Sequence, residues 1–140
     1  MKVVIYYSRS GKVKKVAEAY AKKEGYELIE IQDLVKRSGI LGFIKSGYHA
    51  ARKKETPIKD IKKNLTKYEH VVLCTPVWAG TMASPMRTFL KKYGKQLKSV
   101  EYIIMKGAEE PYLQVMDEMD ALIGKERVKG TSLREGESLE

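Results

Sequence analysis

The chain has 140 residues, of which 43% are hydrophobic and 32% are charged, and this composition suits one globular domain with its own core. No apolar run is long enough to cross a bilayer, and the first residues read as an alternating strand rather than a signal peptide. We therefore expect a cytoplasmic protein with no membrane partner. The single cysteine, Cys74, excludes an internal disulfide and lies in an apolar run typical of a buried thiol, while two histidines alone give no recognisable metal-ligand spacing.

Short β-rich runs alternate with helical patterns along the chain, which is typical of an α/β domain. An apolar strand beginning at Val3 leads through a polar loop into a helix that Gly25 should end. A second strand is predicted over residues 26–31. The long connection after it holds an amphipathic segment around Ile40, Ile44, Tyr48 and Ala51, and a weaker one through Ile58, Ile61 and Leu65.

The second half of the chain continues the same alternation. A third strand is predicted over 71–74, and Ser84 fits the N-cap of the next helix, with Pro85 at its first position and Gly94 at its end.

A fourth strand is predicted over 100–105, and a last helix should open at Pro111 and close at Gly124, with methionines at helical spacing that fill the core. A short polar strand over 127–132 should lie at an edge of the sheet. We accordingly expect one domain over residues 1–133 and a charged, frayed tail over 134–140.

The loop after the first strand has a layout that can hold a phosphate. Ser8 and Ser10 offer hydroxyls, Gly11 permits positive φ and close backbone approach, and the first N–H groups of the next helix have no partner within that helix. Four cations gather there, namely Arg9, Lys12, Lys14 and Lys15, although a helix N-terminus ordinarily favours acidic residues. A bound anion would offset this charge. Solvent screening alone can account for Lys14 and Lys15.

A second candidate wall follows the third strand. In a doubly wound sheet, ligands bind beyond the carboxyl ends of the strands, at the point where the strand order reverses. The only tryptophan, Trp78, lies there between Pro76 and Gly80, and an exposed indole can stack on a planar ring. The alternative is that Trp78 folds back over the core.

The segments YYSRSGKVKKVAEAYAK and YEHVVLCTPVWAGTMASPMRTFL resemble the flavodoxins, and more closely the small flavodoxin-domain proteins of bacteria and archaea. The segment GILGFIKSGYHAARKK fits the same pattern, so the resemblance covers nearly the whole chain up to the tail. It implies a flavodoxin-like three-layer α/β/α sandwich around a five-stranded parallel sheet of order 2-1-3-4-5. It also implies FMN at the carboxyl edge of that sheet.

The resemblance assigns three groups of residues to the cofactor. The phosphate would be held by Ser8, Arg9, Ser10, Gly11, Lys12 and Val13; the first wall of the flavin site would be Pro76, Val77, Trp78, Ala79 and Gly80; and Lys106, Gly107 and Ala108 would approach the other side of the ring and its pyrimidine edge. Relatives usually carry a hydroxyl residue in place of Val13 and often Asn in place of Lys12. The charges of Arg9 and Lys12 can offset the lost hydroxyl. Tyr48 and Tyr112 are the candidates for an aromatic side chain on the outer face of the flavin.

The resemblance implies an FMN-binding protein that acts in electron transfer. Walker A, G-x-G-x-x-G and G-x-S-x-G motifs do not occur in the sequence. The net charge is +9, whereas flavodoxins are typically acidic, so we expect acidic redox partner proteins and a monomer or weak dimer.

Two alternatives stay open. One is an FMN-dependent quinone or nitro reductase. The other is a flavodoxin-fold module without flavin that binds an acidic partner or a polyanion through basic residues such as Arg37, Lys45, Arg52, Lys53 and Lys54. No nucleic-acid motif is present, so we expect no specific nucleic-acid binding.

Overall fold

Five parallel strands form the centre of the domain. The computed structural model describes residues 1–137 and orders these strands β2-β1-β3-β5-β6. Their bounds are β1 (Lys2–Tyr6), β2 (Glu27–Glu30), β3 (His70–Trp78), β5 (Val100–Lys106) and β6 (Lys129–Arg134). The predicted order 2-1-3-4-5 is therefore confirmed. The short strand β4 (Thr81–Met82), which was not predicted, pairs antiparallel with the end of β3.

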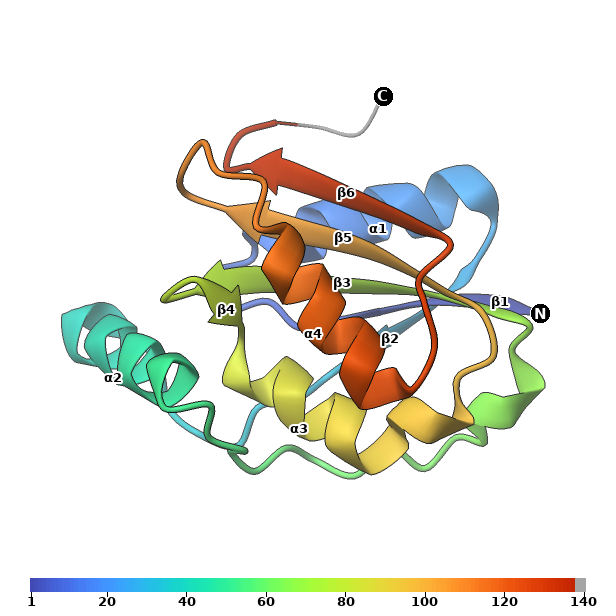
Figure 1. The fold of residues 1–140 in the computed structure, drawn as a ribbon, viewed down its shortest axis with the longest axis horizontal. Coiled ribbons are helices and arrows are strands. Elements are labelled where there is room, and N and C mark those ends of the chain that lie inside the picture. The colour runs from blue at the N-terminus through green and yellow to red at the C-terminus, as the bar shows by residue number, and fades with distance from the viewer. Residues whose placement is uncertain (138–140) are drawn as a thin grey trace.

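Within residues 1–137 the structure has four α-helices, α1 (Lys12–Glu24), α2 (Gly39–Ala51), α3 (Ser84–Tyr93) and α4 (Leu113–Ile123), with 3-10 turns at Leu65–Lys67 and Gly94–Gln96. Helix α1 covers one face and α3 and α4 cover the other, while α2 lies beyond the carboxyl ends of the strands (Figure 1). The central strands β3 and β5 are buried on both faces, which explains their nearly continuous apolar sequences. Cys74 is fully buried in β3 as predicted, and burial raises the pKa of its thiol.

Several element ends follow the sequence signals. Gly25 and Gly124 both cap their helices in the left-handed conformation, with φ of 72° and 88°, where a side chain would be strained. The edge strand starts later than predicted, at Lys129. Asp120 accepts hydrogen bonds from the backbone and the guanidinium of Arg127 and so holds the preceding residues in a turn.

Two helical predictions are wrong. The weaker amphipathic segment through Ile58, Ile61 and Leu65 forms no α-helix; it is an irregular strap whose backbone bonds to the segment after β2, with Lys59 N–H donating to the Gln32 carbonyl at 2.8 Å. Ala83, not Ser84, precedes α3, and the Ser84 hydroxyl is buried among other side chains. No helix within residues 1–137 is long and apolar enough to cross a membrane.

Candidate functional site

The N-terminus of α1 is open to the carboxyl edge of the sheet. Gly11 stands at its N-cap with φ of 93°, no side chain caps the helix, and its first turn has no acidic residue. The first helical backbone bond runs from Lys15 N–H to the Gly11 carbonyl at 3.1 Å. The N–H groups of Lys12, Val13 and Lys14 therefore have no partner within the helix, and they form the donor set that an anion can use.

Part of the loop is already organised by its own hydroxyl. Ser8 Oγ accepts a hydrogen bond from Gly11 N–H at 3.0 Å, which fixes the turn. Ser10 is exposed and lines the cavities on the carboxyl edge of the sheet. The Val13 side chain is buried in the apolar cluster beneath α1, so only its backbone is available to a ligand.

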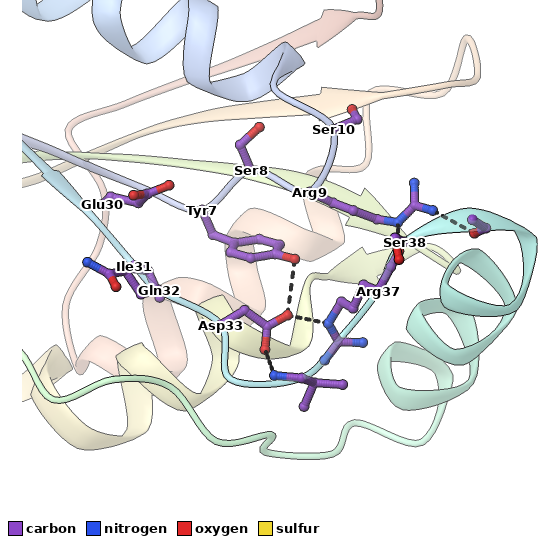
Figure 2. A pocket seen from close by; sticks show the side chains of 12 residues that line it. Tyr7, Ser8, Arg9, Ser10, Glu30, Ile31, Gln32, Asp33, Arg37 and Ser38 are labelled. Carbon is purple, nitrogen blue, oxygen red and sulfur yellow. Dashed lines mark hydrogen bonds and ion pairs between the residues drawn. The ribbon is translucent and has the colours of Figure 1, made fainter.

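The two loop cations predicted to face a phosphate have other partners in this structure. Arg9 Nε donates to the Arg37 carbonyl at 2.9 Å and its Nη2 to the Gly39 carbonyl at 3.1 Å, so its side chain extends toward the start of α2 (Figure 2). Lys12 Nζ lies 2.8 Å from Glu135 Oε2. Glu135 thus supplies an anion that the sequence analysis did not anticipate at this helix end. It belongs to the expected tail, of which residues 138–140 lie outside the described part.

A cavity of about 280 Å³ joins the two predicted loops. Its lining includes these residues that the sequence analysis assigned to the cofactor: Ser8, Arg9, Ser10, Lys12, Val13, Pro76, Val77, Trp78, Ala79 and Gly107. The volume is just below the range of roughly 300–1,000 Å³ for ligand sites. The tertiary structure therefore brings the loop over residues 8–13 and the loop with Trp78 around one space.

Four of the assigned residues, Gly11, Gly80, Lys106 and Ala108, are not among the described residues that line this cavity. Gly80 forms the tight β3–β4 turn with φ of 76°. Lys106 is buried and its Nζ donates to the Glu109 carbonyl at 2.8 Å, so it stabilises the loop after β5 rather than facing the space.

Trp78 has features of both predicted roles, the exposed stacking surface and the cover over the core. Its ring meets Tyr7 edge to face at a centroid distance of 5.5 Å and packs partly against the core, yet it also lines the cavity. The guanidinium carbon of Arg37 lies 5.0 Å from the indole centroid. Trp78 is therefore a fixed wall of the site rather than a freely exposed platform.

Another part of the lining comes from α2, which the sequence analysis left out of the site. Phe43, Ser46 and Gly47 line the cavity, together with Met105 and Glu135. Tyr48 does not line it; its ring is half exposed and is covered by Arg52 and Lys54. The aromatic candidate in this helix is therefore Phe43. Phe43 lies three and four residues before Ser46 and Gly47, and this helical spacing was the signal in the sequence that the three residues share one face.

Arg37 holds α2 against the rest of the domain. Its side chain is only 3% exposed and forms an ion pair with Asp33. The remaining guanidinium hydrogens reach the side chains of Ser46, His49, Thr56 and Ser84 at 3.1–3.3 Å. This network explains why Ser84 is buried. Burial, followed by the nearby Arg37 charge, lowers the pKa of His49, which favours the neutral ring that accepts from Arg37.

A second cavity, of about 540 Å³, also borders the loop over residues 8–13, and Figure 2 shows the side chains that line it. It shares Ser8, Arg9 and Ser10 with the first and extends along the end of β2 past Glu30 and Gln32. In it, Tyr7 Oη donates to Asp33 Oδ2 at 3.2 Å. Within residues 1–137, no three His, Cys, Asp or Glu side chains gather in a way that could hold a metal ion.

Comparisons with known proteins identify the fold. No protein-family model matches the chain, and no curated protein matches it. Among solved structures, a flavoprotein from Lactobacillus acidophilus in complex with FMN is similar over 94% of this chain and 91% of its own, with a TM-score of 0.80 and 20% identity.

More distant flavodoxins have the same arrangement. An archaeal flavodoxin matches 96% of this chain and 85% of its own length, with a TM-score of 0.53 and 19% identity. A flavodoxin variant from Fusobacterium nucleatum bound to flavin mononucleotide matches 91% of this chain and 66% of its own, with a TM-score of 0.52 and 13% identity. The chain therefore has the flavodoxin-like fold.

Proposed function

We propose that this flavodoxin-fold chain binds FMN at the carboxyl edge of its sheet and acts in electron transfer, in the cytoplasm. The observation that carries the proposal is the uncapped N-terminus of α1, which opens into the same cavity as Trp78 and Phe43. A phosphate donor set beside two aromatic walls suits a planar ring with a phosphorylated tail. The FMN-bound structures of similar fold support the same assignment.

Different residues would bind the phosphate and the ring of FMN. The free backbone N–H groups of Lys12 and Val13 and the Ser10 hydroxyl would bind the phosphate, and the Lys12 charge would balance it. Trp78 and Phe43 would contact the ring. Bound FMN would supply the exchange of electrons, while the protein positions the ring, limits its contact with water and sets the charge around it.

Glu135 sets one condition on this proposal, because its carboxylate forms an ion pair with the Lys12 ammonium and Glu135 lines the same cavity. A phosphate entering the site has to displace that carboxylate. The pair is about half exposed on both sides, so breaking it costs little, about 0–1 kcal/mol.

Titration of the purified protein with FMN and with riboflavin tests the proposal. The absorption bands of the flavin and the fluorescence of the only tryptophan report binding. We expect FMN to bind much more tightly than riboflavin, because riboflavin lacks the phosphate. Equal affinities would show that the loop after β1 is not a phosphate site, and no binding of either would leave a flavin-free module.

A reductase that uses FMN is the second candidate, and the 540 Å³ cavity favours it. This cavity adjoins the proposed flavin site through Ser8, Arg9 and Ser10 and offers room for a second molecule. Steady-state oxidation of NADH or NADPH with quinone and nitroaromatic acceptors distinguishes a reductase from a carrier.

We also propose acidic redox partner proteins and a monomeric or weakly dimeric state, on the basis of the net charge of +9. Electron transfer with an acidic partner should slow as salt increases.

A further inference from the structure

Helix α2 presents its apolar side to the outside of the molecule. Exposed fractions are 80% for Ile40 and Leu41, 68% for Phe43, 60% for Ile44 and 50% for Tyr48. The side that faces the domain instead carries Gly42, Ser46 and Ala50, which are buried. The amphipathic segment predicted from the sequence is therefore a helix, but its apolar stripe does not belong to the core.

The small residues on the inner side are required by close packing. A Cβ on Gly42 would lie 2.0 Å from the Arg37 carbonyl carbon, so that backbone leaves no room for a side chain. Arg37 itself forms hydrogen bonds with the Ser46 hydroxyl and the His49 imidazole on the same side. The outward apolar stripe is thus a consequence of how α2 is anchored, and it persists in the folded protein.

The charges within the segment that contains α2 have one sign, although Arg37 pairs with Asp33 and Lys53 with Glu118 from outside it. Residues 34–54 contain six cations and no Asp or Glu. Among the residues described, the exposed side chains of Lys36, Lys45, Arg52 and Lys54 have no carboxylate within 4 Å. Arg52 and Lys54 instead lie over the ring of Tyr48, each 5.4 Å from its centroid. An apolar helix face bordered by cations is typical of a helix that lies in the interface of an anionic membrane.

We propose that α2 docks this protein onto anionic lipid membranes, with Ile40, Leu41 and Ile44 inserted among the acyl chains and the bordering cations at the headgroups. The expectation of no membrane partner rested on the absence of a spanning segment, which such a helix does not need. The shape of this face, together with its bordering cations, favours lipid over another protein. The helix projects from the carboxyl edge of the sheet (Figure 1), and Ile40, Leu41 and Ile44 line neither cavity of the site, so they form a convex face. A flat fluid surface accommodates a projecting helix without a complementary groove.

A second copy of the chain fits this face less well. A symmetric contact through α2 would bring two sets of the same cations together, and the segment supplies no acidic residue to balance them.

Co-sedimentation with vesicles tests the proposal. The wild-type protein should sediment with phosphatidylcholine vesicles that contain phosphatidylglycerol, should remain largely in solution with pure phosphatidylcholine, and should be released by salt. The double variant Ile40→Gln/Ile44→Gln should partition roughly tenfold less, because two large apolar side chains no longer enter the bilayer. Thermal melts confirm that the variant folds.

A matched control is available elsewhere on the surface. Leu113 and Val128 are 54% and 66% exposed, and Leu113→Gln/Val128→Gln makes the same chemical change away from α2, so vesicle binding should not change. Wild-type protein that stays in solution with anionic vesicles would overturn the proposal. An equal loss of vesicle binding in the two double variants would also overturn it. So would a wild-type protein that does not bind vesicles but forms a dimer, if only Ile40→Gln/Ile44→Gln dissociates that dimer. None of these readouts depends on FMN, so the two proposals can fail separately.

Discussion

Trp78 combines two roles, because its ring packs against Tyr7 and the core and also lines the smaller cavity. We expect added FMN to quench its fluorescence, and Trp78→Ala to weaken FMN binding by about 1 kcal/mol, since an aromatic pair contributes roughly 0.5–1.5 kcal/mol beyond burial. Isothermal titration measures the affinity. Trp78→Phe serves as the control for packing and should lose less. Unchanged affinity in Trp78→Ala would mean that the indole only covers the core.

Lys12 tests the charge of the phosphate loop. Lys12→Ala removes an exposed ion pair to Glu135 and also an unfavourable cation at a helix N-terminus, so the two effects should nearly cancel and leave apo stability within about 0.5 kcal/mol. FMN binding should weaken by about 1–2 kcal/mol. Melting curves with and without FMN measure both quantities.

Two further variants separate the role of Lys12 from general charge. Lys14→Ala removes a neighbouring exposed cation and should change FMN affinity much less. Glu135→Gln releases Lys12 and should tighten FMN binding. If Lys14→Ala and Lys12→Ala have the same effect, the contribution of Lys12 is only that of the net charge.

At the level of elements, two glycines of α2 with different surroundings test how closely this helix packs against the domain. Gly42→Ala places a Cβ against the Arg37 backbone and should destabilise the apo-protein by about 1–3 kcal/mol. Gly47→Ala meets no atom within 4 Å and should stabilise it by up to about 1 kcal/mol through helix propensity. Urea unfolding of the apo-proteins measures both. Equal effects at the two positions would show that α2 is not held closely at Gly42.

The stability of the whole molecule against acid depends on a bridge between α3, α4 and β4. The Arg87 guanidinium donates to both oxygens of Glu118, at 2.9 and 3.1 Å, and Thr81 adds a third hydrogen bond at 2.9 Å. These contacts, the Arg87 hydrogen bonds first, lower the pKa of Glu118 from 4.5 to about 2. Because the unfolded chain takes up this proton first, the stabilisation is present above about pH 4.5 and is lost as the pH falls toward 2.

We expect Glu118→Gln to destabilise the protein by about 2 kcal/mol at pH 7 and to match the wild type near pH 2. This is less than the 3–5 kcal/mol of a fully buried pair, because the Glu118 side chain is 24% exposed. Denaturant unfolding across that pH range measures the difference. The exposed Glu126→Gln is the control and should follow the wild type. A constant difference at all pH values would assign the effect to packing rather than to charge.

Local sequence determined the frame of this molecule. The apolar runs of β1, β3 and β5 bury themselves wherever the chain folds into an α/β sheet, and Gly25 and Gly124 end their helices because only glycine adopts that backbone conformation without strain. The loop over residues 8–13 is likewise a local feature, since it depends on hydroxyls, a glycine and the free N–H groups of the next turn. All of these signals act within a few residues.

Tertiary structure decided what lies around that frame. The sequence shows that α2 has an apolar stripe, but which stripe meets the domain depends on the Arg37 backbone, which admits only Gly42 and its small neighbours. Phe43 enters the site for the same reason. Lys12 forms its ion pair with Glu135, which is distant in sequence, and the Ser84 hydroxyl accepts a hydrogen bond from Arg37 instead of capping its own helix. These outcomes depend on steric fit and on pairing between groups far apart in the chain, which no local pattern contains.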